Sequence, residues 1–150
     1  MGISHFEPVS GRCACGAVAY RVADAAKKLY HCHCSVCRRL HGGLFATYAC
    51  VEREHLTVEA GADHLSIYVS DLAKWRFCGV CGCHLFAEHE HNPGMTWYMP
   101  GTLDGDLTPG HPAGSETHIF VGSKSPLARV PDNVPQFEGH APDEAGAEPS

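Results

Sequence analysis

The chain has 150 residues and a formal net charge of −6, with 44% hydrophobic and 19% charged residues. This length and composition predict one globular domain and exclude a disordered, collagen-like or coiled-coil chain. The 11 Lys and Arg form no basic run and are outnumbered by 17 Asp and Glu, which argues against nucleic acid as a partner. No apolar stretch approaches the roughly 20 residues of a membrane span, and the start of the chain lacks the segments of an export signal. We therefore expect a cytoplasmic protein with no membrane partner.

Short segments rich in Val, Tyr, Phe, Thr and Ile recur along the first four-fifths of the chain. In the first, Ala17–Val22, alternate residues share one face, as in a half-buried strand. Six further segments have strand length: Leu44–Cys50, His55–Val58, Leu65–Val69, Trp75–Phe77, Met95–Met99 and His118–Val121. Only Ser35–His41 and Asp71–Lys74 could form a helical turn or two. Because parallel βαβ units need longer helices, the pattern predicts a mainly β fold of antiparallel sheets.

The composition changes after Val121, because five of the ten prolines lie in the last 29 residues. We therefore predict a β domain over residues 1–121 and an irregular, Pro-rich tail over residues 122–150. Phe137 could dock onto the domain, whereas residues 139–150 are expected to be mobile.

Eight of the nine cysteines fall into three clusters, and tight clusters in a reducing compartment favour metal binding over disulfides. Cys13 and Cys15 are expected on one face of a strand. Cys78 and Cys81 flank a knuckle turn that Gly82 permits. Tetrahedral zinc takes four thiolates, so these two pairs together predict a structural zinc site.

The middle cluster, Cys32, Cys34 and Cys37, offers three thiolates within six residues. Three ligands leave one coordination position open, which is typical of catalytic zinc. His33 is expected to point away from the sulfurs and to pack rather than ligate. The chain is thus predicted to hold two zinc ions, one structural and one catalytic.

Five ordered motifs surround these cysteines: Gly11–Tyr20, Cys32–Gly42, Arg76–Gly82, Gly101–Asp104 and His118–Val121. Together they resemble the glutathione-dependent formaldehyde-activating enzymes and the related centromere protein V domain. The resemblance implies an Mss4-like fold of coiled antiparallel β-sheets stapled by zinc. It also implies a structural zinc on Cys13, Cys15, Cys78 and Cys81 and a catalytic zinc on Cys32, Cys34 and Cys37.

The activity that the resemblance implies is that of a carbon–sulfur lyase. A thiol at the open position of the metal is deprotonated near neutral pH, so glutathione or a similar thiol would add to formaldehyde or another small aldehyde. The alkoxide that forms needs a proton donor, for which His31, His33, His41 or a backbone N–H could serve. Arg38 and Arg39 could bind the carboxylates of glutathione, or they could be a solvated pair on a helical turn.

The rival interpretation is a non-catalytic interaction module with two closed structural zinc sites. In that case Cys83 would complete the second site, and a closed site of four sulfurs would do no chemistry. Structural zinc can contribute as much free energy as a whole small domain has, about 10–16 kcal/mol in peptides, so the metal need not imply catalysis.

Overall fold

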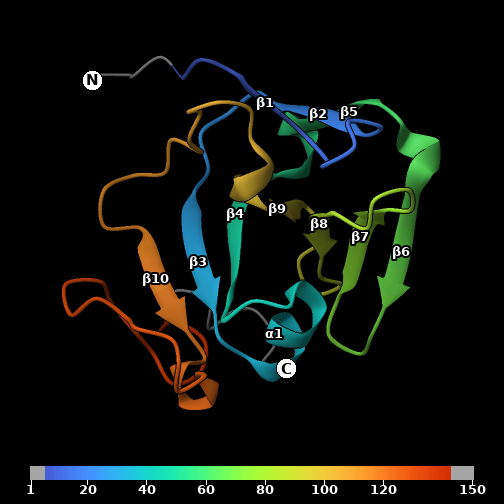
Figure 1. Ribbon diagram of the computed structural model, residues 1–150. Coiled ribbons are helices and arrows are strands. Elements are labelled where there is room, and N and C mark those ends of the chain that lie inside the picture. Colours follow the sequence, from blue (N-terminus) through green and yellow to red (C-terminus); the bar gives the residue numbers. More distant parts are fainter. Residues whose placement is uncertain (1–5, 143–150) are drawn as a thin grey trace.

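The computed structural model describes residues 6–142 and has two β-sheets and one α-helix (Figure 1). The smaller sheet has the order β1-β2-β5, with β1 at Val9–Arg12, β2 at Ala19–Val22 and β5 at Leu56–Ala60. The larger sheet has the order β10-β3-β4-β9-β8-β7-β6. Its strands are β3 (Lys28–Cys32), β4 (Ala46–Glu52), β6 (Leu65–Val69), β7 (Lys74–Cys78), β8 (His84–Glu88), β9 (Met95–Tyr98) and β10 (Glu116–Ile119).

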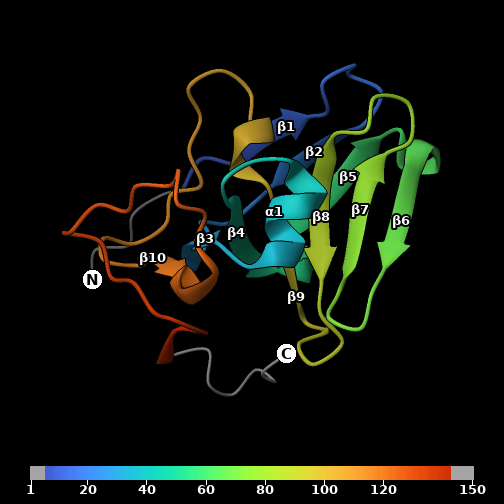
Figure 2. The same cartoon turned by 60° about the horizontal axis from the view of Figure 1, so that its bottom comes forward.

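The helix α1 (Ser35–His41) follows β3 directly at the lower end of the large sheet in Figure 1 and faces the viewer in Figure 2. Short 3₁₀ turns connect strands at Arg53–His55, Ala62–His64 and Pro100–Thr102, and another follows the last strand at Val121–Ser123. The predicted mainly β class is confirmed. The strand pairs are antiparallel except for β3 and β10, which run parallel.

Alternation along the strands of the large sheet gives it two buried faces. On β4, Ala49 and Val51 pack in a cluster with Tyr20 of the small sheet, whereas Tyr48 and Cys50 pack in a second cluster. Neighbouring residues of a strand point to opposite faces, so one face of the large sheet supports the small sheet. The other face carries the second cluster, together with α1.

Three strands lie outside the predicted segments: β1, β3 and β8. In β8, Leu85, Phe86 and Ala87 are all buried, so the alternating pattern of a half-exposed strand is missing. The predicted helical turn at Asp71–Lys74 is wrong. Ser70 instead forms the turn between β6 and β7, since its N–H donates to Ala73 O at 3.0 Å and its Oγ accepts from Leu72 N–H at 3.0 Å.

The chain after β10 folds back along that strand. The N–H of His118 donates to Pro135 O at 2.9 Å, the N–H of Phe137 donates to His118 O at 3.0 Å, and the side chain of Phe137 packs against the second cluster. The N–H of Phe120 donates to Gly139 O at 3.0 Å, and Ala141 is buried. The expectation of mobility is therefore wrong for residues 139–142, while its remainder, residues 143–150, lies outside the described residues.

No helix among residues 6–142 is both long enough and apolar enough to span a membrane.

The backbone at Gly61 lies directly against the turn that follows β1. Its φ is +77°, and a Cβ there would overlap the carbonyl oxygen of Ala17. We expect Gly61→Ala to lower the free energy of unfolding in urea by at least about 2 kcal/mol. Gly94→Ala is the control, because nothing lies within 4 Å of a Cβ at that position. Equal stability of the two variants would contradict this account of the close approach.

Candidate metal centres

The first cysteine pair lies in a tight turn between β1 and β2. The N–H of Cys13 donates to Val18 O at 3.0 Å, and the N–H of Gly16 donates to Cys13 O at 3.1 Å. Gly16 has a φ of +82°, which glycine adopts without strain. The prediction that Cys13 and Cys15 share a strand is therefore wrong, since β1 ends at Arg12. The turn nevertheless directs both sulfurs to one side.

A turn of the same kind joins β7 to β8 and carries the second pair. The N–H of Cys78 donates to Cys83 O at 2.9 Å, the N–H of Gly82 donates to Cys78 O at 2.7 Å, and Gly82 has a φ of +81°. This is the turn expected from the sequence.

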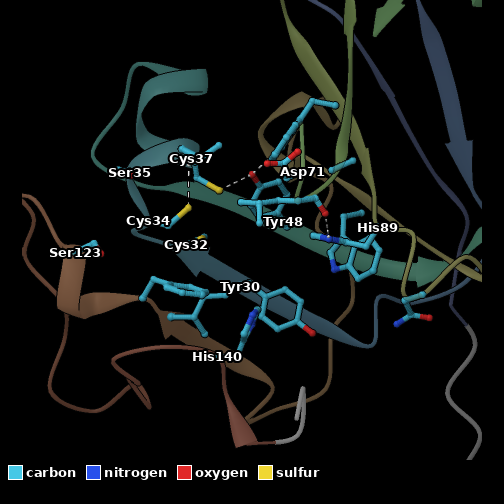
Figure 3. Close-up of a pocket in the computed structure, with 18 of the residues that line it drawn as sticks. Tyr30, Cys32, Cys34, Ser35, Cys37, Tyr48, Asp71, His89, Ser123 and His140 are labelled. Atoms are coloured by element: carbon cyan, nitrogen blue, oxygen red, sulfur yellow. Dashed lines mark hydrogen bonds between the residues drawn. The ribbon is translucent and has the colours of Figure 1, made fainter. Parts of the chain in front are cut away.

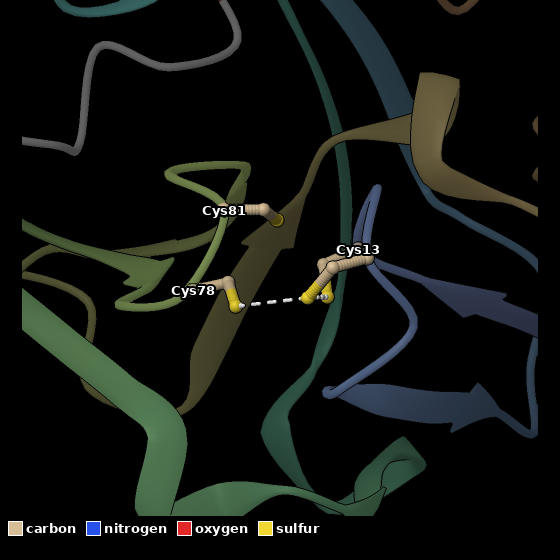
Figure 4. Close-up of side chains that lie close together, drawn as sticks. Cys13, Cys78 and Cys81 are labelled. Atoms are coloured by element: carbon tan, nitrogen blue, oxygen red, sulfur yellow. Dashed lines mark hydrogen bonds between the residues drawn. The ribbon is translucent and has the colours of Figure 1, made fainter.

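These two turns bring together the sulfurs of Cys13, Cys15, Cys78 and Cys81, which all lie within 4.8 Å of one another (Figure 4). Cys15 Sγ is 3.7 Å from Cys13 Sγ and 3.9 Å from Cys78 Sγ. Four sulfurs arranged tetrahedrally around zinc at about 2.3 Å would be about 3.8 Å apart. Both the donor atoms and their spacing therefore fit a four-thiolate zinc site.

Backbone N–H groups support these sulfurs as thiolates. Val18 N–H donates to Cys13 Sγ at 3.3 Å, and Val80 N–H donates to Cys78 Sγ at 3.4 Å. A hydrogen bond from an N–H group stabilises the charged form of the acceptor, which is the form that binds metal.

The second cluster forms where β3 passes into α1. Cys32 is the last residue of β3, Cys34 is the N-cap of α1, and Cys37 lies in the first helical turn. The N–H of Cys37 donates to Cys34 Sγ at 3.3 Å, which caps the helix and orients the sulfur. The three sulfurs lie within 4.8 Å of one another, and among residues 6–142 no fourth His, Cys, Asp or Glu joins this group.

Tyr48 of β4 contacts the triplet from the sheet below it. Its hydroxyl lies 3.1 Å from Cys37 Sγ and accepts a hydrogen bond from Trp75 Nε1 at 3.5 Å. Burial, followed by the nearby Cys37, raises the pKa of Tyr48 well above its usual range. The hydroxyl therefore keeps its proton and, with Cys37 as a thiolate, donates a hydrogen bond to the sulfur, which reduces the negative charge there.

The triplet forms part of the wall of a cavity of about 590 Å³ (Figure 3). Other parts of the wall come from β3, β4, β7, β8, β9 and the segment after β10. Aromatic and aliphatic side chains predominate, and the polar residues are Ser35, Asp71, His89, His91, Asn92, Ser123 and His140. A cavity of this size next to three cysteines that leave one coordination position open is the arrangement expected of a binding site.

The histidines that the sequence offered as proton donors lie elsewhere. His33 is fully buried, with its Nε2 hydrogen-bonded to His118 Nδ1 at 2.9 Å and its ring 4.9 Å from that of Phe45. The ring of His31 lies 4.4 Å from that of His118, tilted by 31°, and its Nε2 lies 2.7 Å from Glu116 Oε2. His31 and His33 alternate with Cys32, so they face away from the cavity. Packing rather than ligation was expected for His33.

The histidines that do line the cavity are His89, His91 and His140. His89 Nδ1 lies 3.1 Å from Leu72 O, and its ring meets Trp97 edge to face at 4.7 Å. Because a carbonyl oxygen can only accept, the proton of neutral His89 sits on Nδ1. The sequence around His89 and His91 indicates a polar turn, and His140 lies in the tail. Only the folding of β8 and of the chain end places them here.

The other predicted residues are found as follows. Arg38 Nε donates to His33 O at 3.3 Å, and Arg39 is exposed. Neither is among the described residues that line the cavity, and their binding of a thiol substrate stays a prediction.

Cys83 lies next to the four-cysteine cluster, with its Sγ 3.6 Å from His84 O. It is therefore not placed to close the triplet of Cys32, Cys34 and Cys37.

The sequence pattern of the glutathione-dependent formaldehyde-activating enzymes matches residues 8–123, which include both cysteine clusters. This chain belongs to that family. A Halomonas elongata protein named for glutathione-dependent formaldehyde activation is 29% identical over 150 residues, covering 93% of this chain and 92% of the relative. A Fusarium vanettenii protein of the same name is 32% identical over 95 residues, covering 60% of this chain and 51% of the relative.

The fold of this formaldehyde-activating enzyme family member is also similar to a crystal structure of a Rhodobacter sphaeroides protein. The two share 30% sequence identity with a TM-score of 0.57, over 65% of this chain and 90% of the other.

Two neighbouring cysteines, Cys81 and Cys83, are expected to respond differently to substitution. We expect Cys81→Ser to lower the zinc content by about one ion per chain and to lower the melting temperature, because the remaining three thiolates of the first cluster bind metal less tightly. Cys83→Ser should keep the zinc content of the wild type, since Cys83 lies outside both groups. Elemental analysis and thermal unfolding of the purified variants measure both effects. Loss of zinc in Cys83→Ser instead would contradict this ligand set.

Proposed function

We propose that this protein is a zinc-dependent carbon–sulfur lyase that forms and cleaves adducts of glutathione, or a similar small thiol, with formaldehyde or another small aldehyde. The observation that carries the proposal is the convergence of Cys32, Cys34 and Cys37 on the wall of a cavity of about 590 Å³. Membership of the formaldehyde-activating family supports the same reaction.

The three thiolates fit a zinc site with one open position. Zinc bound there supplies a position at which a substrate thiol is held as its thiolate near neutral pH. The protein's own groups prepare that position. The N–H of Cys37 and the hydroxyl of Tyr48 donate to Cys34 Sγ and Cys37 Sγ respectively, which holds both sulfurs in place and stabilises them as ligands.

In the forward direction, the sulfur of the substrate thiolate attacks the carbonyl carbon of the aldehyde and forms the carbon–sulfur bond. The carbonyl oxygen gains the electron pair of the broken π bond and takes up one proton. In the reverse direction the hydroxyl loses that proton and the carbon–sulfur bond breaks. The site must therefore supply and remove a single proton near the carbonyl oxygen.

We assign the transfer of that proton to His89. It lines the cavity, and the hydrogen bond of Nδ1 to Leu72 O and the contact with Trp97 hold its ring in one orientation. With Nδ1 donating to a carbonyl, Nε2 is the nitrogen that exchanges a proton with substrate. His31 lies on the other face of β3, and His33 is fully buried against His118, so neither is assigned this role.

Cobalt substitution tests the open position directly. In the Co²⁺-loaded protein, adding glutathione or 2-mercaptoethanol should change the sulfur-to-metal absorption, because a new thiolate enters the coordination sphere. Cys34→Ser should abolish this response while keeping the cobalt of the first cluster, and Cys83→Ser should keep the response. A wild-type spectrum that neither thiol alters would favour the closed, non-catalytic module.

His89→Gln tests the proton transfer. We expect kcat for adduct formation, followed by exchange NMR, to fall about 100-fold with little change in the thiol-induced cobalt spectrum, because general acid–base catalysis typically contributes at least this much. The control is His64→Gln, since His64 lies in the 3₁₀ turn before β6 and not in the cavity wall. An unchanged kcat would remove His89 from the mechanism.

A further inference from the structure

The cavity beside the cysteine triplet is much larger than the formaldehyde part of an adduct would fill. Its volume of about 590 Å³ lies within the range of sites that enclose ligands of drug-like size. A water molecule takes up about 30 Å³ of the liquid, and formaldehyde contains only one heavy atom more. Most of this space must therefore receive another part of the substrate.

Five aromatic side chains line that space: Tyr30, Tyr48, Trp75, Trp97 and Phe120. Tyr30, Tyr48 and Trp75 are each at least nine-tenths buried, and the last two are joined by the hydrogen bond from Trp75 Nε1. Leu72, Val36 and Ile119 add aliphatic surface. Rigid aromatic walls favour the binding of flat or branched apolar groups. Such groups are stabilised by burial of their apolar surface and by edge and face contacts with the rings.

Fixed positive charge is missing from the cavity. Among the described residues that line it, none is Lys or Arg, and Asp71 contributes a carboxylate. The segments outside the described residues, 1–5 and 143–150, contain no Lys or Arg either. A carboxylate that leaves water without a cationic partner incurs a large desolvation cost. Glutathione carries two carboxylates, so this cavity does not suit its charged ends.

Several basic side chains of the protein have partners elsewhere. Arg12 pairs with Asp104 at 2.9 Å, and Arg53 and Arg76 both pair with Glu88. Lys124 Nζ donates to the carbonyl oxygen of Ala128 at 3.1 Å. These cations are held by interactions that would have to break before they could neutralise a bound anion.

We infer that the cavity selects thiol–aldehyde adducts that carry an uncharged aromatic or bulky apolar group, and that it disfavours the formaldehyde adduct of glutathione. The inference rests on the proposed function, because it concerns the substrate of the same site. The apolar group can belong to the thiol half or to the aldehyde half of the adduct, since both are attached to the carbon–sulfur bond.

Titration of the Co²⁺-loaded full chain, followed by the sulfur-to-metal absorption, measures the preference without relying on turnover. Benzyl mercaptan should bind at least 10-fold more tightly than glutathione if the thiol half fills the cavity. If the aldehyde half fills it, glutathione with phenylacetaldehyde should bind at least 10-fold more tightly than glutathione with formaldehyde. The inference is overturned when neither aromatic compound exceeds its counterpart.

Two variants connect the preference to the wall. Trp97→Ala should reduce the preference for the aromatic compound at least threefold. Asp71→Lys, at an exposed position of the wall, should tighten glutathione binding at least threefold, whereas Asp63→Lys, an exposed charge reversal in the turn before β6, should leave it unchanged. Equal effects of the two charge reversals would show that overall charge, not the cavity, sets the affinity, and would overturn the inference.

The outcomes separate this inference from the proposed function. If glutathione binds as tightly as benzyl mercaptan and its phenylacetaldehyde adduct gains nothing, the substrate class is wrong while the thiol-binding metal site stands. If no thiol changes the absorption, the proposed function fails, and the substrate inference fails with it.

Discussion

The convergence of four cysteine sulfurs from two distant turns is the constraint on which the rest of the structure depends. One turn joins β1 to β2 in the small sheet, and the other joins β7 to β8 in the large sheet. A metal held by Cys13, Cys15, Cys78 and Cys81 would therefore tie the two sheets together. Cys13 and Cys78 are also buried in the hydrophobic cluster between these sheets. Metal ligation and apolar burial thus stabilise the same contact, and unfolding would disrupt both at once.

The large sheet separates two kinds of polar chemistry on its opposite faces. Along β3, Tyr30 and Cys32 point toward the cavity, while His31 points to the other side, where its ring lies 4.4 Å from that of His118. Burial, with the neighbouring His31 and His33, lowers the pKa of His118 to about 4, so this ring stays neutral at pH 7. His118 thus adds no positive charge close behind the cysteine triplet, and the cavity face carries the three sulfurs, aromatic rings and the histidines His89, His91 and His140.

The cysteine triplet and the cavity are physically coupled through Tyr48. Its hydroxyl contacts Cys37 Sγ and receives the indole N–H of Trp75, so one side chain touches a ligand and orders a wall of the cavity. A substrate that shifts Trp75 would also disturb the hydrogen bond to the ligand sulfur. Under the proposed function, this coupling would make the chemistry at sulfur depend on how well a substrate fits the cavity.

The sequence by itself determined the mainly β class, the helical turn Ser35–His41 and the partition of seven cysteines into groups of four and three, because strand alternation and chelate spacing are local properties of the chain. It misplaced Cys13 and Cys15 on a strand, since turn geometry at Gly16 depends on hydrogen bonds to Val18. Only the tertiary structure decided which histidines line the cavity beside the triplet. His89 lies 52 residues after Cys37 in the chain and His140 lies 103 residues after it, and strand pairing and burial, which no local pattern encodes, bring both to the same cavity.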